Sequence, residues 1–64
     1  MKYRHYKGGV YTYICDAIAE WDRELHLIIY EDEKGNRWCR PRFDFYGYVI
    51  VDGKQIRRFE KIEE

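Results

Sequence analysis

The residues best suited to chemistry in this 64-residue chain are arginines interleaved with aromatic and imidazole rings. They fall into three segments, at residues 3–7, 37–43 and 57–59. Arginine captures phosphate or carboxylate through paired hydrogen bonds and also stacks on rings, and tyrosine and tryptophan offer an apolar face with a polar group. The pattern predicts one pocket for a small anionic, nucleotide-like ligand, bordered by Arg4, His5, Tyr6, Trp38, Arg40 and Arg58.

A purely structural role would explain the same residues. The chain has 12 basic and 12 acidic residues, so its arginines can pair with carboxylates at the surface, Arg40 with Asp44 for example. Tyr6 and Trp38 would then be core rings. Ligand binding by alanine variants that keep their melting temperature separates the two interpretations.

Other chemistries have less support. The chain contains no serine, which excludes serine-based triads, and it lacks the glycine spacing of phosphate-binding loops. The four best metal ligands lack the local pairs of structural zinc sites, so we interpret them as buried thiols and strand histidines: His5, Cys15, His26 and Cys39. We therefore expect a binding module rather than an enzyme, with no metal and no cofactor.

Size and charge limit the partners. Residues 1–64 suffice for one small domain. A net charge of zero disfavours a dedicated nucleic-acid binder. The longest apolar run, residues 27–30, is far shorter than the roughly 18 residues of a membrane span, and no secretory signal is visible. We expect no membrane partner, a cytoplasmic location and two reduced cysteines without a bridge between them.

These residues must be positioned by strands. Residues 10–15, 25–30, 37–40, 48–51 and 55–59 have strand composition, and turn signals lie at 31–36 and at Asp52-Gly53. Residues 16–24 fit a loop, an irregular strand continuation or one helical turn. Residues 42–46 fit a short loop or a 3₁₀ turn, and residues 60–64 are expected to fray. The pattern predicts an all-β fold, a small antiparallel barrel or roll of five to six short strands.

Strand alternation also predicts which side chains face the core. The inward set is Val10, Ile14, Leu27, Ile29, Val49, Val51 and Ile56. Twelve aromatic rings, 19% of the chain, either fill that core or provide a stacking surface.

Two motifs are specific enough to indicate a family: the opening run Tyr3-Arg4-His5-Tyr6-Lys7-Gly8-Gly9 and the Trp38-x-Arg40-Pro41 motif. They are accompanied by Tyr11, Ala17, Tyr30, Phe45, Val49, Asp52-Gly53 and Arg58-Phe59. With these residues the chain resembles the bacterial and phage family called domain of unknown function 1653, from Tyr3 to about Ile62. The resemblance implies an SH3-like β-barrel and no settled activity. The chain departs from the family at residues 18–22, where members carry a His-Ser-Glu-Thr-like run, in a shorter turn before Trp38, and at Arg57, where they carry proline.

Two further functions stay open. SH3-like barrels commonly bind extended peptides, which makes a protein-interaction module the second candidate, by analogy of fold. Binding of single-stranded nucleic acid through ring stacking is the third. Because so short a chain encloses little volume, we expect the ligand site to lie at a homo-oligomer interface.

Overall fold

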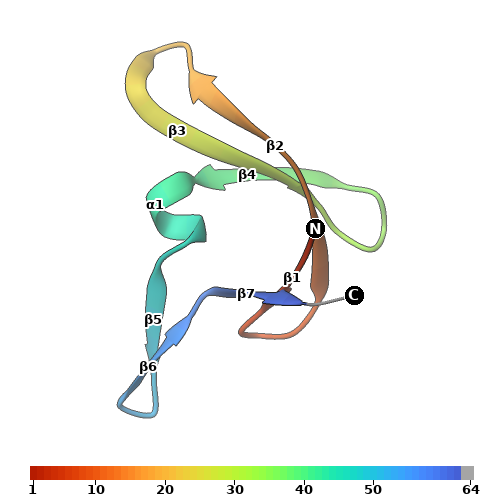
Figure 1. Cartoon of the computed structure of the whole chain (residues 1–64), viewed down its shortest axis with the longest axis vertical. Helices are drawn as coiled ribbons and strands as arrows, with labels where there is room; N and C mark the ends of the chain where they lie inside the picture. The colour runs from red at the N-terminus through yellow and green to blue at the C-terminus, as the bar shows by residue number, and fades with distance from the viewer. Residues whose placement is uncertain (63–64) are drawn as a thin grey trace.

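The computed structural model describes residues 1–62, and its secondary structure is almost entirely β. The described residues form seven strands and one helical turn, in the order β1 (Lys2–His5), β2 (Val10–Ala19), β3 (Asp22–Glu31), β4 (Arg37–Pro41), α1 (Arg42–Phe45), β5 (Tyr48–Val51), β6 (Lys54–Arg57) and β7 (Phe59–Ile62). An antiparallel sheet has the strand order β4-β3-β2-β1-β7, and β5 pairs with β6 (Figure 1). The prediction of a small all-β barrel or roll is confirmed, with seven strands instead of five or six.

The longest element is the hairpin of β2 and β3. It includes residues 16–24, whose composition fitted a loop, an irregular strand continuation or one helical turn. Both strands run for ten residues and meet in a turn at Glu20 and Trp21. The Asp22 carboxylate steadies the start of β3 by accepting a 3.1 Å hydrogen bond from the Glu24 amide. β4 pairs with β3 only at residues 27–31, and β1 pairs with β2 only at residues 10–12. The outer half of the hairpin therefore projects as a two-stranded arm (Figure 1).

Within residues 42–46, where a loop or a 3₁₀ turn was expected, Arg42–Phe45 form one helical turn, α1. Pro41 ends β4 because it has no amide hydrogen for the ladder, and it enters α1 with an extended ψ of 138°. The Tyr46 amide then donates to the Arg42 carbonyl, and the Gly47 amide donates to the Asp44 carbonyl.

The C-terminal segment differs most from the prediction. The expected strand 55–59 is interrupted at Arg58, so that β6 ends before it and β7 joins the other sheet beside β1. Residues 60–62 are paired in β7, and the expectation that they fray was wrong; residues 63–64 lie outside the described part of the chain. The Arg58 amide donates to the Gly47 carbonyl, which fixes the point where the chain changes sheets.

The core is built mainly from rings. Its buried apolar residues are Tyr3, Ala19, Ile28, Tyr30, Phe45 and Phe59. Phe45 stacks on Phe59 with the ring centroids 4.3 Å apart, and Tyr3 meets Phe45 edge-on at 5.2 Å. Offset and edge-to-face arrangements suit the charge distribution of aromatic rings.

The predicted inward set was wrong on β3 and β6, whereas on β5 Val49 and Val51 are more buried than Tyr48 and Ile50, as predicted. On β3 the buried residues are Ile28 and Tyr30, while Leu27 and Ile29 are half-buried. The other members, Val10, Ile14, Val49 and Val51, are half-buried too, and Ile56 is exposed. Four apolar residues in succession make both faces of β3 apolar, so that the packing of Tyr30 among the other rings decides which face is covered.

Both thiols are free and exposed, so the interpretation of buried thiols was wrong. Cys15 and Cys39 each pair with Ile29, from opposite sides. They therefore share the outer face of the sheet two strands apart, at a Cα separation of about 10 Å. A disulfide needs Cα atoms within about 7 Å, so this geometry does not permit a bridge. Within residues 1–62 no helix is long and apolar enough to cross a membrane.

Candidate ligand-binding pocket

A pocket of about 260 Å³ opens on the core-facing side of the five-stranded sheet. It is lined by His5, Tyr11, Tyr30, Trp38, Arg40 and Phe59, and every strand of the sheet contributes at least one of these residues. The register explains the grouping, because His5 pairs with Phe59 and Tyr30 pairs with Trp38, and paired residues share a face. One chain forms the pocket, whereas the size of the chain predicted a site shared between copies.

The aromatic residues form a fixed wall around Phe59. The centroids of His5, Tyr30 and Tyr11 lie 4.8, 5.4 and 5.7 Å from that of Phe59, all edge-to-face. Trp38 lies at the rim, is 52% exposed, and donates a 2.9 Å hydrogen bond from Nε1 to the Asp32 carboxylate. The indole is thus held in place while much of its surface remains open for stacking.

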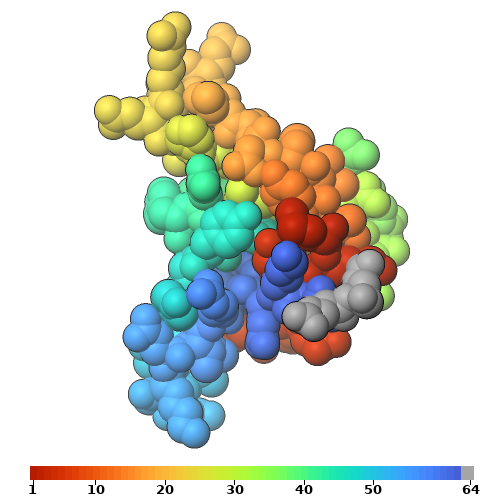
Figure 2. Space-filling view, viewed as in Figure 1, coloured from red at the N-terminus to blue at the C-terminus, as the bar shows by residue number. Residues whose placement is uncertain are grey.

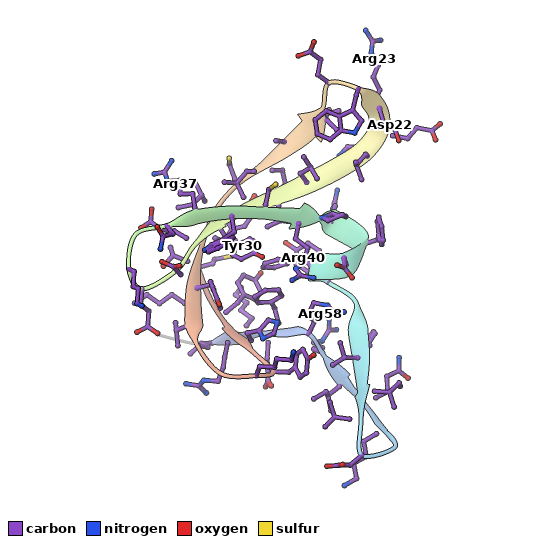
Figure 3. All side chains as sticks on the ribbon, turned by 180° about the vertical axis from the view of Figure 1, so that it is seen from behind. Asp22, Arg23, Tyr30, Arg37, Arg40 and Arg58 are labelled. Carbon is purple, nitrogen blue, oxygen red and sulfur yellow. The ribbon has the colours of Figure 1, made fainter. Side chains whose placement is uncertain are left out.

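Two arginines meet at one carboxylate beside this wall. Arg40 Nη1 donates to Asp44 Oδ2 at 2.7 Å, and Arg58 Nη2 lies 3.6 Å from Asp44 Oδ1. The pairing of Arg40 with Asp44, offered as the structural alternative, thus exists in a residue that also lines the pocket. Figure 3 shows Tyr30, Arg40 and Arg58 gathered near the centre of the molecule, whereas Arg23 lies at the tip of the arm. Two guanidinium groups around one carboxylate leave the region with net positive charge.

Arg40 lies over one of the rings of the pocket wall. Its guanidinium carbon lies 5.9 Å from the Phe59 centroid. Hydrogen bonding to Tyr30, with the hydrogen bond to Asp44 adding to it, raises the pKa of Arg40. The Nε atoms of Arg40 and Arg58 are buried and have no hydrogen-bond partner among residues 1–62. An unpartnered buried donor carries a desolvation cost, so the Asp44 carboxylate satisfies the two guanidinium groups only in part.

His5 is a titratable group in the pocket wall. Its Nδ1 accepts a 3.2 Å hydrogen bond from the Lys7 amide, which leaves Nε2 to carry the proton of the neutral ring. Burial, and then the positive charges of Arg40, Arg58 and Lys7, lower the pKa of His5 from its ordinary value of 6.5. The pocket wall therefore presents a neutral imidazole at neutral pH.

This lowered pKa predicts a loss of stability in mild acid. Below pH 6.5 the unfolded chain takes up a proton at His5 that the folded chain resists. With respect to His5, the free energy of unfolding therefore has its full value above pH 6.5 and decreases as the pH falls below 6.5. Urea unfolding of wild type and His5→Gln across this range measures the effect. We expect a flatter pH dependence for His5→Gln, and an unchanged slope would contradict the prediction.

The structure brings most of the predicted site residues together. His5, Trp38 and Arg40 line the pocket. Arg58 does not line it, but it pairs with Asp44, the same carboxylate that Arg40 binds. Tyr6 lies beside the pocket rather than in its wall: its ring centroid is 4.7 Å from that of His5, and its amide donates to the Arg58 carbonyl. Neither Tyr6 nor Trp38 is buried, so the interpretation of both as core rings was wrong. That these residues bind a ligand stays a prediction.

Arg4 does not join the other five. It lies between Tyr3 and His5 on β1, and neighbouring residues of a strand point to opposite faces. Arg4 is exposed and lines a separate hollow with Glu60, Lys61 and Ile62. Its place in the predicted set is therefore wrong.

Sequence reasoning missed Tyr11, Tyr30 and Phe59 as pocket residues. All three are positions that carry the family resemblance, and the Tyr30–Trp38 pair follows from a hairpin closed at residues 31–36. Among the described residues there is no group of three or more His, Cys, Asp or Glu side chains placed to hold a metal ion.

One comparison with known proteins bears on this pocket. The sequence model of a family described as "Protein of unknown function (DUF1653)" matches residues 1–61, a range that includes every residue lining the pocket. No curated protein and no solved structure matches the chain.

Proposed function

Because the chain belongs to the family described as "Protein of unknown function (DUF1653)", whose description names no activity, we propose a function from the pocket itself. The protein is a non-catalytic binding module for a small anionic, nucleotide-like ligand. The observation that carries this proposal is Arg40, a partly exposed guanidinium in the wall of an aromatic pocket.

The two kinds of side chain suit two parts of one ligand. A phosphate or carboxylate would bind Arg40 and accept a hydrogen bond from His5 Nε2, where charge-assisted hydrogen bonds are strong. A planar base would stack on the rings, and Trp38 is the most exposed of them in the pocket wall. The volume of about 260 Å³ is slightly below the roughly 300–1,000 Å³ of pockets for drug-sized ligands, which favours a mononucleotide or one end of a larger molecule.

Calorimetric titration with a nucleoside monophosphate, the matching nucleoside and inorganic phosphate tests the proposal. We expect the nucleotide to bind more tightly than either fragment, because only the nucleotide uses both the rings and the cation. Arg40→Gln should weaken binding by at least about tenfold, since a hydrogen bond to a charged group contributes roughly 1.5–3 kcal/mol.

Arg37→Gln is the matched control, because Arg37 is on the same strand but exposed and paired with Glu31. This variant should bind as wild type does, and both variants should remain folded at the temperature of the titration. Equal binding by the two variants, or no binding of any of the three compounds by wild type, would show that the pocket is not an anion site.

A protein-interaction module is the second candidate, favoured by a neighbouring hollow. That hollow, of about 380 Å³, shares Tyr11 and Trp38 with the first and is also lined by Asp32 and Glu33. Two hollows that share Tyr11 and Trp38 would suit an extended peptide, and the carboxylates of the second hollow disfavour a nucleic-acid backbone. Single-stranded DNA serves as a further titrant, because its binding, if present, falls steeply with added salt.

The proposed location is the cytoplasm. Cys15 and Cys39 are exposed free thiols, and such thiols persist in compartments that keep cysteines reduced.

A further inference from the structure

The protein is more extended than a compact chain of its size. Its radius of gyration is 12.4 Å, compared with about 11 Å for a compact domain of 64 residues. Its accessible surface is 5107 Å², compared with about 4,500 Å² for a monomer of 8.0 kDa. The excess is roughly 600 Å², close to the roughly 800 Å² that each partner buries in a standard interface.

Two projections account for the extended shape. The arm of β2 and β3 projects at one end of the long axis and the β5–β6 hairpin at the other, with α1 between them (Figures 1 and 2). Within residues 1–62, β5 and β6 pair only with each other. An isolated two-stranded hairpin is at best marginally stable in water, so this element needs a packing partner.

These projections carry most of the exposed apolar side chains. Seven of the nine large exposed hydrophobic residues lie on the arm, on or next to α1, or on the β5–β6 hairpin. We define the crescent face by the most exposed of them: Ile18, Trp21, Phe43, Tyr46, Tyr48 and Ile50. Ile18, Trp21, Phe43 and Ile50 are 59%, 77%, 76% and 71% exposed.

The arm and α1 form one continuous part of this face. Ile18 pairs with His26 across the arm and so shares its side of the ribbon. His26 and Glu24 line a hollow of about 370 Å³ together with Phe43 and Tyr46. The inner side of the arm thus continues into α1 with nothing among residues 1–62 covering it.

The two ends of the crescent face have opposite charge. Residues 20–24 of the arm carry three carboxylates and one arginine, a net charge of −2. Residues 48–57 of the hairpin carry Asp52, Lys54 and Arg57, a net charge of +1. A two-fold axis between two copies would bring each arm against the other copy's hairpin, so that both contacts would join unlike charges and bury apolar side chains.

We propose that the crescent face is the interface of a homodimer, in which the β2–β3 arm of each protomer packs on the β5–β6 hairpin of its partner. None of the residues that line the ligand pocket belongs to this face, so the test of the dimer and the test of the proposed ligand are independent of each other.

Sedimentation equilibrium first measures the assembly state. At about 100 μM, above the micromolar dissociation constants of weak specific interfaces, wild type should have twice the chain mass of 8.0 kDa. Phe43→Glu and Ile50→Glu should be monomeric, because each places a charge at an apolar contact. Lys34→Glu, exposed in the turn before β4, should remain dimeric. Circular dichroism confirms that each variant keeps its β structure.

A mixing experiment then tests the pairing of arm with hairpin. The arm variant Glu20→Lys with Glu24→Lys, and the hairpin variant Lys54→Glu with Arg57→Glu, should each be monomeric alone, because both contacts then join like charges. A mixture of the two should dimerise, since one contact is then wild type and the other is charge-swapped.

Three results would overturn the proposal: a monomeric wild type, a Phe43→Glu or Ile50→Glu variant that stays dimeric, or charge variants that fail to associate when mixed. A wild type that binds a different protein through this face while remaining monomeric gives the first of these results.

Discussion

Phe45→Ala should lower the free energy of unfolding by about 3–5 kcal/mol, the usual cost of deleting a buried phenylalanine ring. Phe45 has no exposed surface, stacks on Phe59, and contacts the rings of Tyr3, Tyr30 and Tyr46. A chain with so few buried residues has little stability in reserve, because small single cores rarely supply more than about 3–5 kcal/mol. We therefore expect Phe45→Ala to be largely unfolded at room temperature.

The control is Phe43→Ala, the same substitution two residues earlier on the same helical turn. Phe43 is 76% exposed, so its replacement should change the stability of the protomer by no more than about 0.5 kcal/mol. Urea unfolding followed by circular dichroism, over a series of protein concentrations, separates protomer stability from association. Equal losses for both variants would show that Phe45 is not the centre of the core.

Asp44→Ala is expected to lower the free energy of unfolding by about 1–2 kcal/mol. Asp44 is the shared partner of Arg40 and Arg58, whose side chains are 28% and 22% exposed. Removing one member of a fully buried pair costs roughly 3–5 kcal/mol, and partial exposure reduces that cost through solvent screening. Without the carboxylate, the two guanidinium groups also repel a proton at His5 more strongly, so the pKa of His5 should fall further.

Urea unfolding and an NMR titration of the His5 ring measure both effects. Asp44→Asn keeps the shape of the side chain but not its charge, so that a pKa change shared by both variants is electrostatic in origin. Glu20→Ala, at the exposed turn of the arm, should leave the pKa of His5 unchanged and protomer stability nearly so. An unchanged stability and His5 pKa in Asp44→Ala would mean that the carboxylate does not organise the two arginines.

The parts of the site that depend on local sequence could be predicted. Trp38 and Arg40 precede a proline that ends a strand, and the hairpin turn before them sets their pairing with β3. Asp44 follows Arg40 by four residues, within reach once one helical turn forms. Alternation along a strand would also have separated Arg4 from His5, and grouping them by residue type set that rule aside.

Other features depend on contacts between distant segments. Residues 55–59 look like one strand, but the chain bends at Arg58 because β7 is held by β1. On β3, four successive apolar residues carry no alternation, so only the packed rings distinguish Ile28 from Ile29. The composition of residues 16–24 likewise does not distinguish a loop, a strand and a helical turn, and the pairing of β2 with β3 makes this segment part of a β-hairpin. Sequence patterns do not report these tertiary interactions.

The position of β1 between β2 and β7 sets an order for folding. The β2–β3 hairpin joins two strands that follow each other directly in the sequence and needs only a tight turn, so it forms early. The β1–β7 ladder joins Lys2 to Ile62, roughly 60 residues apart. Because closing so long a loop costs conformational entropy before the contacts of the ladder stabilise it, this ladder forms late. On the ribosome, β7, which carries Phe59, is synthesised after the other strands of its sheet, so the pocket and the ring core are completed together only after β7 has left the exit tunnel.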